Sequence, residues 1–178
     1  MAEDRKSWEI KNEAILDDLV ALMGLTEEEK SAMATCKDDA AAAGGAMIDA
    51  FYDRLLNQDT TSEFLEGMVD HLRGTLADWF LQLFSGNYDQ TYVQSRLAIG
   101  ETHVRIGLPV RYPLAMMDIL MEHGERVASS HGDLAVTAFR KLAALDIAIF
   151  NQAYENRQLT HLAELVGNER LARRLLQK

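Results

Sequence analysis

Apolar side chains recur along this chain with the period of an α-helix, and the alternating pattern of a β-strand is absent. The only two prolines, Pro109 and Pro113, stand close together, so little interrupts the helical pattern elsewhere. The pattern therefore predicts an all-helical protein.

Capping signals divide the first part of the chain into helices. A first helix ends at Gly24, a residue suited to a left-handed C-terminal cap. Its apolar stripe consists of Trp8, Ile15, Leu19 and Leu22. The stretch 26–29 (TEEE) has the form of a capping box, and 60–63 (TTSE) repeats it. Between these two signals we expect a helix from about Asp38 to Leu56.

Two further helices have apolar stripes at helical spacing. The first starts near residue 68 and is closed by Gly86, and its stripe is Met68, Leu72, Leu76, Trp79 and Leu83. Asp89 can cap the second, whose stripe is Tyr92, Ile99, His103 and Ile106. An imidazole therefore leaves this helix on the same side as large apolar side chains.

The last part of the chain predicts a helix from about Leu114 to Ser129 and a very long one from Asp133. No stop signal is evident before Glu155 in the long helix. It is expected to have two apolar faces. One, expected against the core, holds Leu134, Leu142, Leu145 and Ile149, and the other, left for a partner, holds Phe139, Ala143, Phe150 and Tyr154.

Composition narrows the possible classes of protein. The 178 residues, 48% of them hydrophobic, suit one compact domain, and the single Cys36 and lack of a signal-peptide pattern favour the cytoplasm. A net charge of −10 makes nucleic acid an unfavourable partner. No charge-free run approaches the ~20 residues that a membrane span needs.

His103 has two readings on its own residues. The more common one is a core histidine with hydrogen-bonded ring nitrogens. Zinc is disfavoured because neither an H-E-x-x-H motif nor paired cysteines are present. Haem needs only one axial imidazole and apolar walls, so it is the cofactor that a lone histidine can anchor.

The combination of three segments resembles the sensor globin of globin-coupled sensors. These segments are AFYDRLL, VDHLRGTLADWF and RLAIGETHVRIGL, in the family's order and at nearly its spacings. The resemblance implies a globin fold with an extra N-terminal helix and a long C-terminal helix. Residues 1–156 would form the sensor globin domain, and 157–178 the start of a helical linker to an output domain.

The resemblance also implies a haem b (iron protoporphyrin IX) site. His103 would be the proximal iron ligand, Tyr52 the distal donor to bound dioxygen, and Thr75 a second donor. Leu72 would lie above the distal side. The other expected cofactor-binding residues are Phe51, Leu76, Trp79, Ile99, Ile106 and Tyr112. The family often has Trp followed by Tyr where this chain has Tyr112 followed by Pro113, so the role of Tyr112 is open.

Spacing alone leaves alternatives for these residues. On spacing alone Tyr52 would more often be an interface aromatic than a ligand donor, and a threonine such as Thr75 in mid-helix commonly bonds its own i−4 carbonyl. His71 points about 100° away from Leu72 around the helix, as a surface histidine would.

The function implied by the resemblance is that of a dioxygen sensor and not of an enzyme. The module would bind dioxygen at ferrous haem, form a homodimer through its last two helices, and regulate a diguanylate cyclase or a chemotaxis transducer. The alternative is a haem-free globin-fold interaction module of a stress regulator.

Overall fold

The computed structural model describes residues 6–8 and 13–176, and within them it contains helices and no β-strand. The all-helical prediction is confirmed. The elements are η1 (Lys6–Trp8), α1 (Glu13–Met23), α2 (Glu27–Thr35), α3 (Lys37–Leu56), α4 (Asp59–Ser62), α5 (Val69–Gln82), α6 (Gln90–Arg105), α7 (Arg111–Ser129), α8 (Asp133–Val166) and α9 (Glu169–Leu176).

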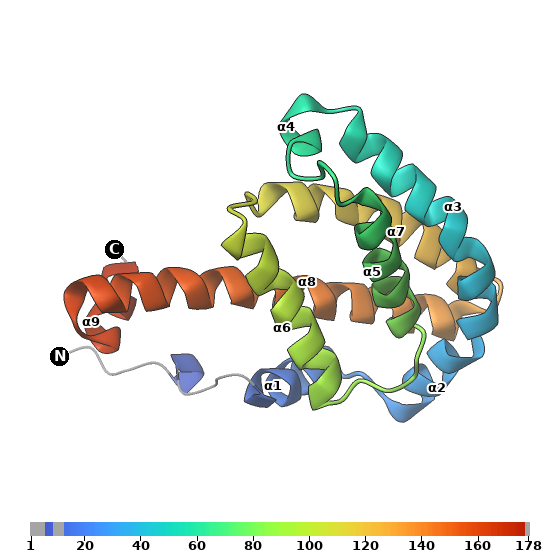
Figure 1. Cartoon of the computed structure of the whole chain (residues 1–178). Helices are drawn as coiled ribbons and strands as arrows, with labels where there is room; N and C mark the ends of the chain where they lie inside the picture. Colours follow the sequence, from blue (N-terminus) through green and yellow to red (C-terminus); the bar gives the residue numbers. More distant parts are fainter. Residues whose placement is uncertain (1–5, 9–12, 177–178) are drawn as a thin grey trace.

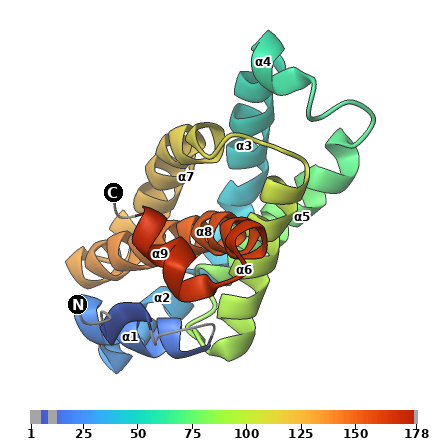
Figure 2. The same ribbon diagram turned by 90° about the vertical axis from the view of Figure 1, so that its left-hand side faces the viewer.

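Helix α8 runs through the middle of the fold, and most other helices pack around it (Figure 1). Helices α2, α6 and α7 lie directly against α8, while α3 packs on both α5 and α7. Viewed along α8, α3 stands above it, α5 lies to its right, and α1 lies below and to the left (Figure 2). The core between them is aromatic and aliphatic, with Phe80, Phe84, Phe139, Met47 and Leu142 fully buried.

The helix starts agree with the capping signals in two of three places, and one of these is Asp89, whose carboxylate accepts a hydrogen bond from the Tyr92 N–H at the start of α6. Thr26 and Glu29 form the predicted capping box at α2, with both reciprocal hydrogen bonds present. Glu29 also accepts a hydrogen bond from Lys141 of α8, which ties this helix start to the core. The prediction for residues 60–63 is wrong. Thr61 there is buried and donates its hydroxyl hydrogen to the Leu55 carbonyl, so it stabilises the turn after α3.

The first helix differs from its predicted stripe at both ends. Trp8 belongs to η1, a 3-10 turn that precedes α1 and is not part of it. Leu22 is 79% exposed. Ile15 is buried and Leu19 packs against the core as predicted. Beside them Leu16 is buried and Val20 and Met23 pack against the core, so the inward face of α1 is shifted away from Leu22.

The long helix α8 ends at a glycine, and only one of its two predicted apolar faces is present. It ends at Val166, where Gly167 adopts a left-handed φ of 71°, and α9 folds back against it. Phe139 and Ala143, predicted to face a partner, are buried within the chain, whereas Leu134, predicted for the core, is 49% exposed. The Phe139 ring stacks on that of Phe84, with the ring centres 5.8 Å apart.

Helix α6 approaches α8 very closely at Gly100. A Cβ atom on Gly100 would lie 2.6 Å from the Ala153 Cβ and 3.1 Å from the Phe150 carbonyl oxygen. Both distances are shorter than normal contacts, and one of the atoms belongs to the backbone. Only glycine lets the two helices cross at this separation, one turn before His103.

None of the described helices is both long and apolar enough to cross a bilayer.

Substitution of Gly100 by alanine should lower the free energy of unfolding by about 1–3 kcal/mol, because the added methyl group must push α6 away from α8. Gly45 of α3 is the matched control, since its Cβ would meet nothing within 4 Å. Gly45→Ala should stabilise the protein by about 0.5–1 kcal/mol through better helix propensity. Urea unfolding of both variants measures this, and equal effects would contradict the close crossing.

Candidate functional site

A cavity of about 420 Å³ lies between helices α3, α5, α6, α7 and α8. Its volume is in the range of small-molecule and cofactor sites, and most of its lining side chains are apolar. All ten predicted site residues line it: Phe51, Tyr52, Leu72, Thr75, Leu76, Trp79, Ile99, His103, Ile106 and Tyr112. The fold thus brings together residues that are far apart in the sequence, and their binding roles stay predictions.

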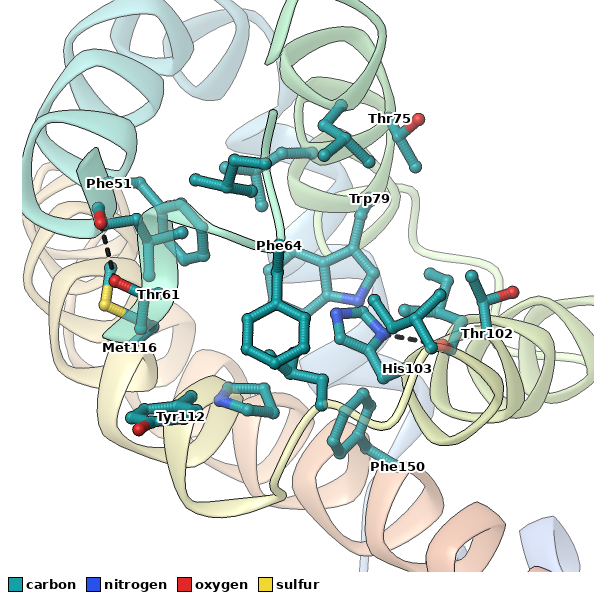
Figure 3. Close-up of a pocket in the computed structure, with 18 of the residues that line it drawn as sticks. Phe51, Thr61, Phe64, Thr75, Trp79, Thr102, His103, Tyr112, Met116 and Phe150 are labelled. Atoms are coloured by element: carbon teal, nitrogen blue, oxygen red, sulfur yellow. Dashed lines mark hydrogen bonds between the residues drawn. The ribbon is translucent and has the colours of Figure 1, made fainter. Parts of the chain in front are cut away.

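His103 projects into this cavity from the last turn of α6. Its Nδ1 lies 2.7 Å from the carbonyl oxygen of Ile99, so Nδ1–H donates a hydrogen bond within the helix. The other ring nitrogen is directed into the cavity (Figure 3). Burial lowers the pKa of the imidazole, with the hydrogen bond to Ile99 opposing that shift. A neutral ring that donates through Nδ1 carries a lone pair on Nε2, which is the form that binds metals.

The ring of His103 is held from one side by Phe150 of α8. The two rings meet edge to face, with their centres 5.3 Å apart. The prediction that Phe150 faces a partner is therefore wrong, because this side chain lines the cavity. One turn later Tyr154 donates its hydroxyl hydrogen to the Leu108 carbonyl, 2.9 Å away, and so ties α8 to the turn after α6.

Helix α3 forms the opposite side of the cavity, where Figure 3 shows Phe51 far from His103. The next residue, Tyr52, is 4% exposed and lines the cavity. Burial raises the pKa of its hydroxyl to about 12, although Arg73, 5.8 Å from the ring centre, opposes the shift. The hydroxyl has no hydrogen-bond partner among the described residues, so its donor is available to a molecule in the cavity.

The α5 side chains cover the cavity between these two sides. Leu72, Leu76 and Trp79 are partly buried and pack against the core. Thr75 is exposed, and its hydroxyl lies 3.3 Å from the His71 carbonyl oxygen. The i−4 hydrogen bond that spacing allowed is therefore formed, and it occupies the donor of Thr75.

Tyr112 stands near the start of α7, at the end of the cavity beside α4. Its pKa is lowered by hydrogen bonds from Thr60 and Arg111. The Arg111 guanidinium also lies over the ring, 4.7 Å from its centre. Tyr112 thus connects α7 with the α4 segment.

A buried ion pair that the sequence reading missed also borders the cavity. The Arg96 Nε donates to an Asp146 carboxylate oxygen 3.0 Å away, and both side chains are almost fully buried. Tyr92 donates to the other oxygen of Asp146, and Arg96 also donates to the Trp79 carbonyl. Burial raises the pKa of Asp146, and the Arg96 guanidinium opposes that rise. The network ties α6 to α5 and α8.

Two signals in the sequence could have revealed this network. Arg96 lies two turns before His103, on the same helical stripe. Asp146 is the single charged residue in the apolar segment LAALDIAIF, where a buried carboxylate needs a partner.

The donor set of the cavity fits a cofactor that needs one imidazole. Within residues 6–8 and 13–176, no three His, Cys, Asp or Glu side chains gather as a metal site would require. Of the two histidines that line the cavity, His71 is exposed to solvent, and His103 directs a ring nitrogen into the cavity against walls that are mainly apolar. Such an arrangement accommodates a flat apolar macrocycle with one axial nitrogen ligand.

Comparison with known families matches the protoglobin model to residues 12–160. The chain belongs to the protoglobin family. The globin fold predicted for this protoglobin is confirmed by its similarity to the globin domain of the Geobacter sulfurreducens globin-coupled sensor. The two are 27% identical with a TM-score of 0.72, over 78% of this chain and 96% of that one. The predicted kinship with globin-coupled sensors is confirmed as well.

A curated relative is the "Heme-based aerotactic transducer HemAT" of Halobacterium salinarum. It is 26% identical over 136 residues, which cover 70% of this protoglobin and 27% of the relative. The protoglobin therefore spans about a quarter of that longer protein.

The Tyr52 hydroxyl should titrate at about pH 12 in the ligand-free protein. Because the pKa is raised above its ordinary value of 10.0, the neutral hydroxyl contributes its full stability below pH 10.0, and this contribution is lost as the pH rises through about 12. Ultraviolet difference titration of wild type against Tyr52→Phe isolates this group. A difference curve centred at the ordinary value would contradict the desolvation of Tyr52.

Proposed function

We propose that this protoglobin is a haem-based gas-sensing domain that binds dioxygen and passes its ligation state to an output domain. One observation carries the proposal: a neutral imidazole, fixed through Nδ1, points its free nitrogen into an apolar cavity of cofactor size. Membership of the family supports it, and so does the similarity to a relative described as haem-based.

The chain's own residues have separate tasks in this proposal. His103 Nε2 would hold the iron of haem b, and the Ile99 carbonyl would keep the ring in the neutral tautomer that binds it. The apolar walls would enclose the macrocycle and exclude water. The haem supplies reversible binding of a diatomic gas when its iron is ferrous.

Tyr52 is the favoured hydrogen-bond donor to dioxygen held in the cavity. Tyr52 is 4% exposed, and its hydroxyl is protonated at neutral pH and has no partner among the described residues. Thr75 is the weaker candidate because its hydroxyl already bonds to the His71 carbonyl. Leu72 occupies the place on α5 from which a second histidine could reach the iron. This position therefore offers the iron no second imidazole.

The proximal side offers a route by which ligation can reach α8. A movement of His103 would press on Phe150, with which its ring is in contact. Phe150 contacts Tyr154, whose hydroxyl bonds to the Leu108 carbonyl. A shift of one side chain would in this way change how α8 lies against the turn that leads into α7.

The partners are proposed from the resemblance and from the relative. We propose a homodimer through α7 and α8, in which exposed small residues such as Ala115 and Ala144 can lie at the contact. The relative's name describes an aerotactic transducer, and a chemotaxis-type transducer or a diguanylate cyclase is the proposed output domain. Residues 157–178 would begin the link to it, and the sensor domain would act as a cytoplasmic, non-enzymatic regulatory input.

His103→Ala should weaken haem binding by more than about 100-fold. Even the loss of a residue that only orients a metal ligand lowers metal affinity by about 10- to 100-fold, and His103 would be the ligand itself. The control is His161→Ala, an exposed histidine of α8 that does not line the cavity. Titration of apo protein with haemin, followed by the porphyrin absorption band, measures both. Wild-type affinity in His103→Ala would disprove the ligand assignment, and a wild type without haem binding would favour the haem-free module.

Tyr52→Phe should speed dioxygen release from the ferrous protein by roughly 10- to 150-fold. A hydrogen bond to a partly charged acceptor contributes about 1.5–3 kcal/mol, and its loss falls mainly on the dissociation rate. Thr75→Val is the comparison and should have a much smaller effect, because that hydroxyl is engaged within its helix. Stopped-flow kinetics distinguish the two, and the reverse ranking would assign the donor to Thr75.

A further inference from the structure

We define the mouth of the cavity as its solvent-exposed edge at α5 and α6, two helices that are not among the closely packed pairs. Figure 3 shows Thr75 of α5 and Thr102 of α6 on this same side of the cavity. One turn from each threonine stands a side chain that can donate to an anion, His71 on α5 and Arg105 on α6. All four residues line the cavity and are exposed to solvent.

Arg105 differs from the other arginine of the cavity. Arg96 is buried and paired with Asp146. Arg105 has a hydrogen bond to the Thr102 hydroxyl at 3.3 Å and, within the described residues, no carboxylate oxygen within 4 Å. Arg105 thus lacks a carboxylate partner within the described residues, although the chain has many carboxylates and a net charge of −10. Most of its guanidinium donors are therefore available to a ligand.

The cavity has no unpaired acidic side chain to balance Arg105. Asp146 is the one acidic residue among the described lining residues, and its two carboxylate oxygens already accept hydrogen bonds from Tyr92 and Arg96. His71 adds a further donor at the mouth, because a histidine ring carries at least one N–H in either charge state. The interior is thus apolar and the mouth favours negative charge.

We propose that Arg105, together with His71, binds the carboxylate groups at the edge of a flat apolar ligand whose body fills the cavity. The inference rests on the proposed function, in which that ligand is a porphyrin with two carboxylates. These contacts would orient the ring with its charged edge in water and its apolar edge inside the cavity. They would also let the site discriminate porphyrin diacids from neutral porphyrins, apart from any bond to iron.

The test compares haemin with haemin dimethyl ester, which lacks the negative charges but keeps the iron and the ring. Apo wild type, Arg105→Gln and His71→Gln are titrated with each compound in the same mild-detergent buffer at low salt. Arg157→Gln is the matched control, an exposed arginine of α8 outside the cavity. Metal-free protoporphyrin, followed by its fluorescence, repeats the comparison without iron coordination.

Wild type should bind the diacid more tightly than the diester, and Arg105→Gln should weaken diacid binding about 2- to 5-fold, as expected for an exposed charge pair. His71→Gln should have a smaller effect in the same direction. Neither variant should change binding of the diester, Arg157→Gln should change neither, and the difference should shrink at high salt.

Equal affinity of wild type for diacid and diester would overturn the proposal. An equal loss of affinity for the diacid and the diester in Arg105→Gln would also overturn it, because such a loss would show that the substitution acts on the structure and not on the carboxylates. In either case haem binding, and with it the proposed function, would stand. Failure of wild type to bind any of the three porphyrins would overturn the proposed function and this inference together.

Discussion

The close crossing of α6 over α8 is the constraint on which the rest of the site depends. Gly100 allows the backbones to approach so that Ala153 and Phe150 lie against it. One turn beyond the crossing, α6 delivers His103 to the cavity, and α8 supplies Phe150 to hold the ring from the side. A wider crossing would separate these two rings and would leave the imidazole of His103 less firmly held.

A second requirement is that polar groups inside an apolar site form hydrogen bonds. The Arg96–Asp146 pair meets it by sharing hydrogen bonds with Tyr92 and the Trp79 carbonyl, so the buried charges are compensated. Within the described residues no fully buried side-chain nitrogen or oxygen lacks a partner. The Tyr52 hydroxyl and the second ring nitrogen of His103 have no partner among the described residues, so neither atom is fully buried and both are available to a molecule in the cavity.

Much of the fold follows from local signals, and the failures have identifiable causes. The Thr26–Glu29 capping box was predictable because both partners lie within one turn, whereas Thr61 bonds to a carbonyl of the preceding helix that spacing does not reveal. Phe139 and Phe150 were assigned to the wrong side because α8 is surrounded by other helices. A helix buried on several sides has no single apolar stripe.

The candidate site was found from the sequence mainly through the family resemblance, since a histidine on an apolar stripe has two readings. The structure adds what no local pattern contains, namely that α3, α5 and α6 bring the ten predicted residues around one cavity. Arg96 and Asp146 were missed, and Phe150 was not recognised as a lining residue, because their positions depend on contacts between helices.

The central claim is that His103 binds haem iron through Nε2, with Nδ1–H held by the Ile99 carbonyl. Resonance Raman spectroscopy of the deoxygenated ferrous protein, prepared with ordinary histidine and with histidine carrying the heavy nitrogen isotope, tests it most directly. We expect an iron–histidine stretching band that shifts with the isotope and disappears in His103→Gly unless imidazole is added. A band that persists unchanged in that variant, or a ferrous protein without an isotope-sensitive band, would contradict the account.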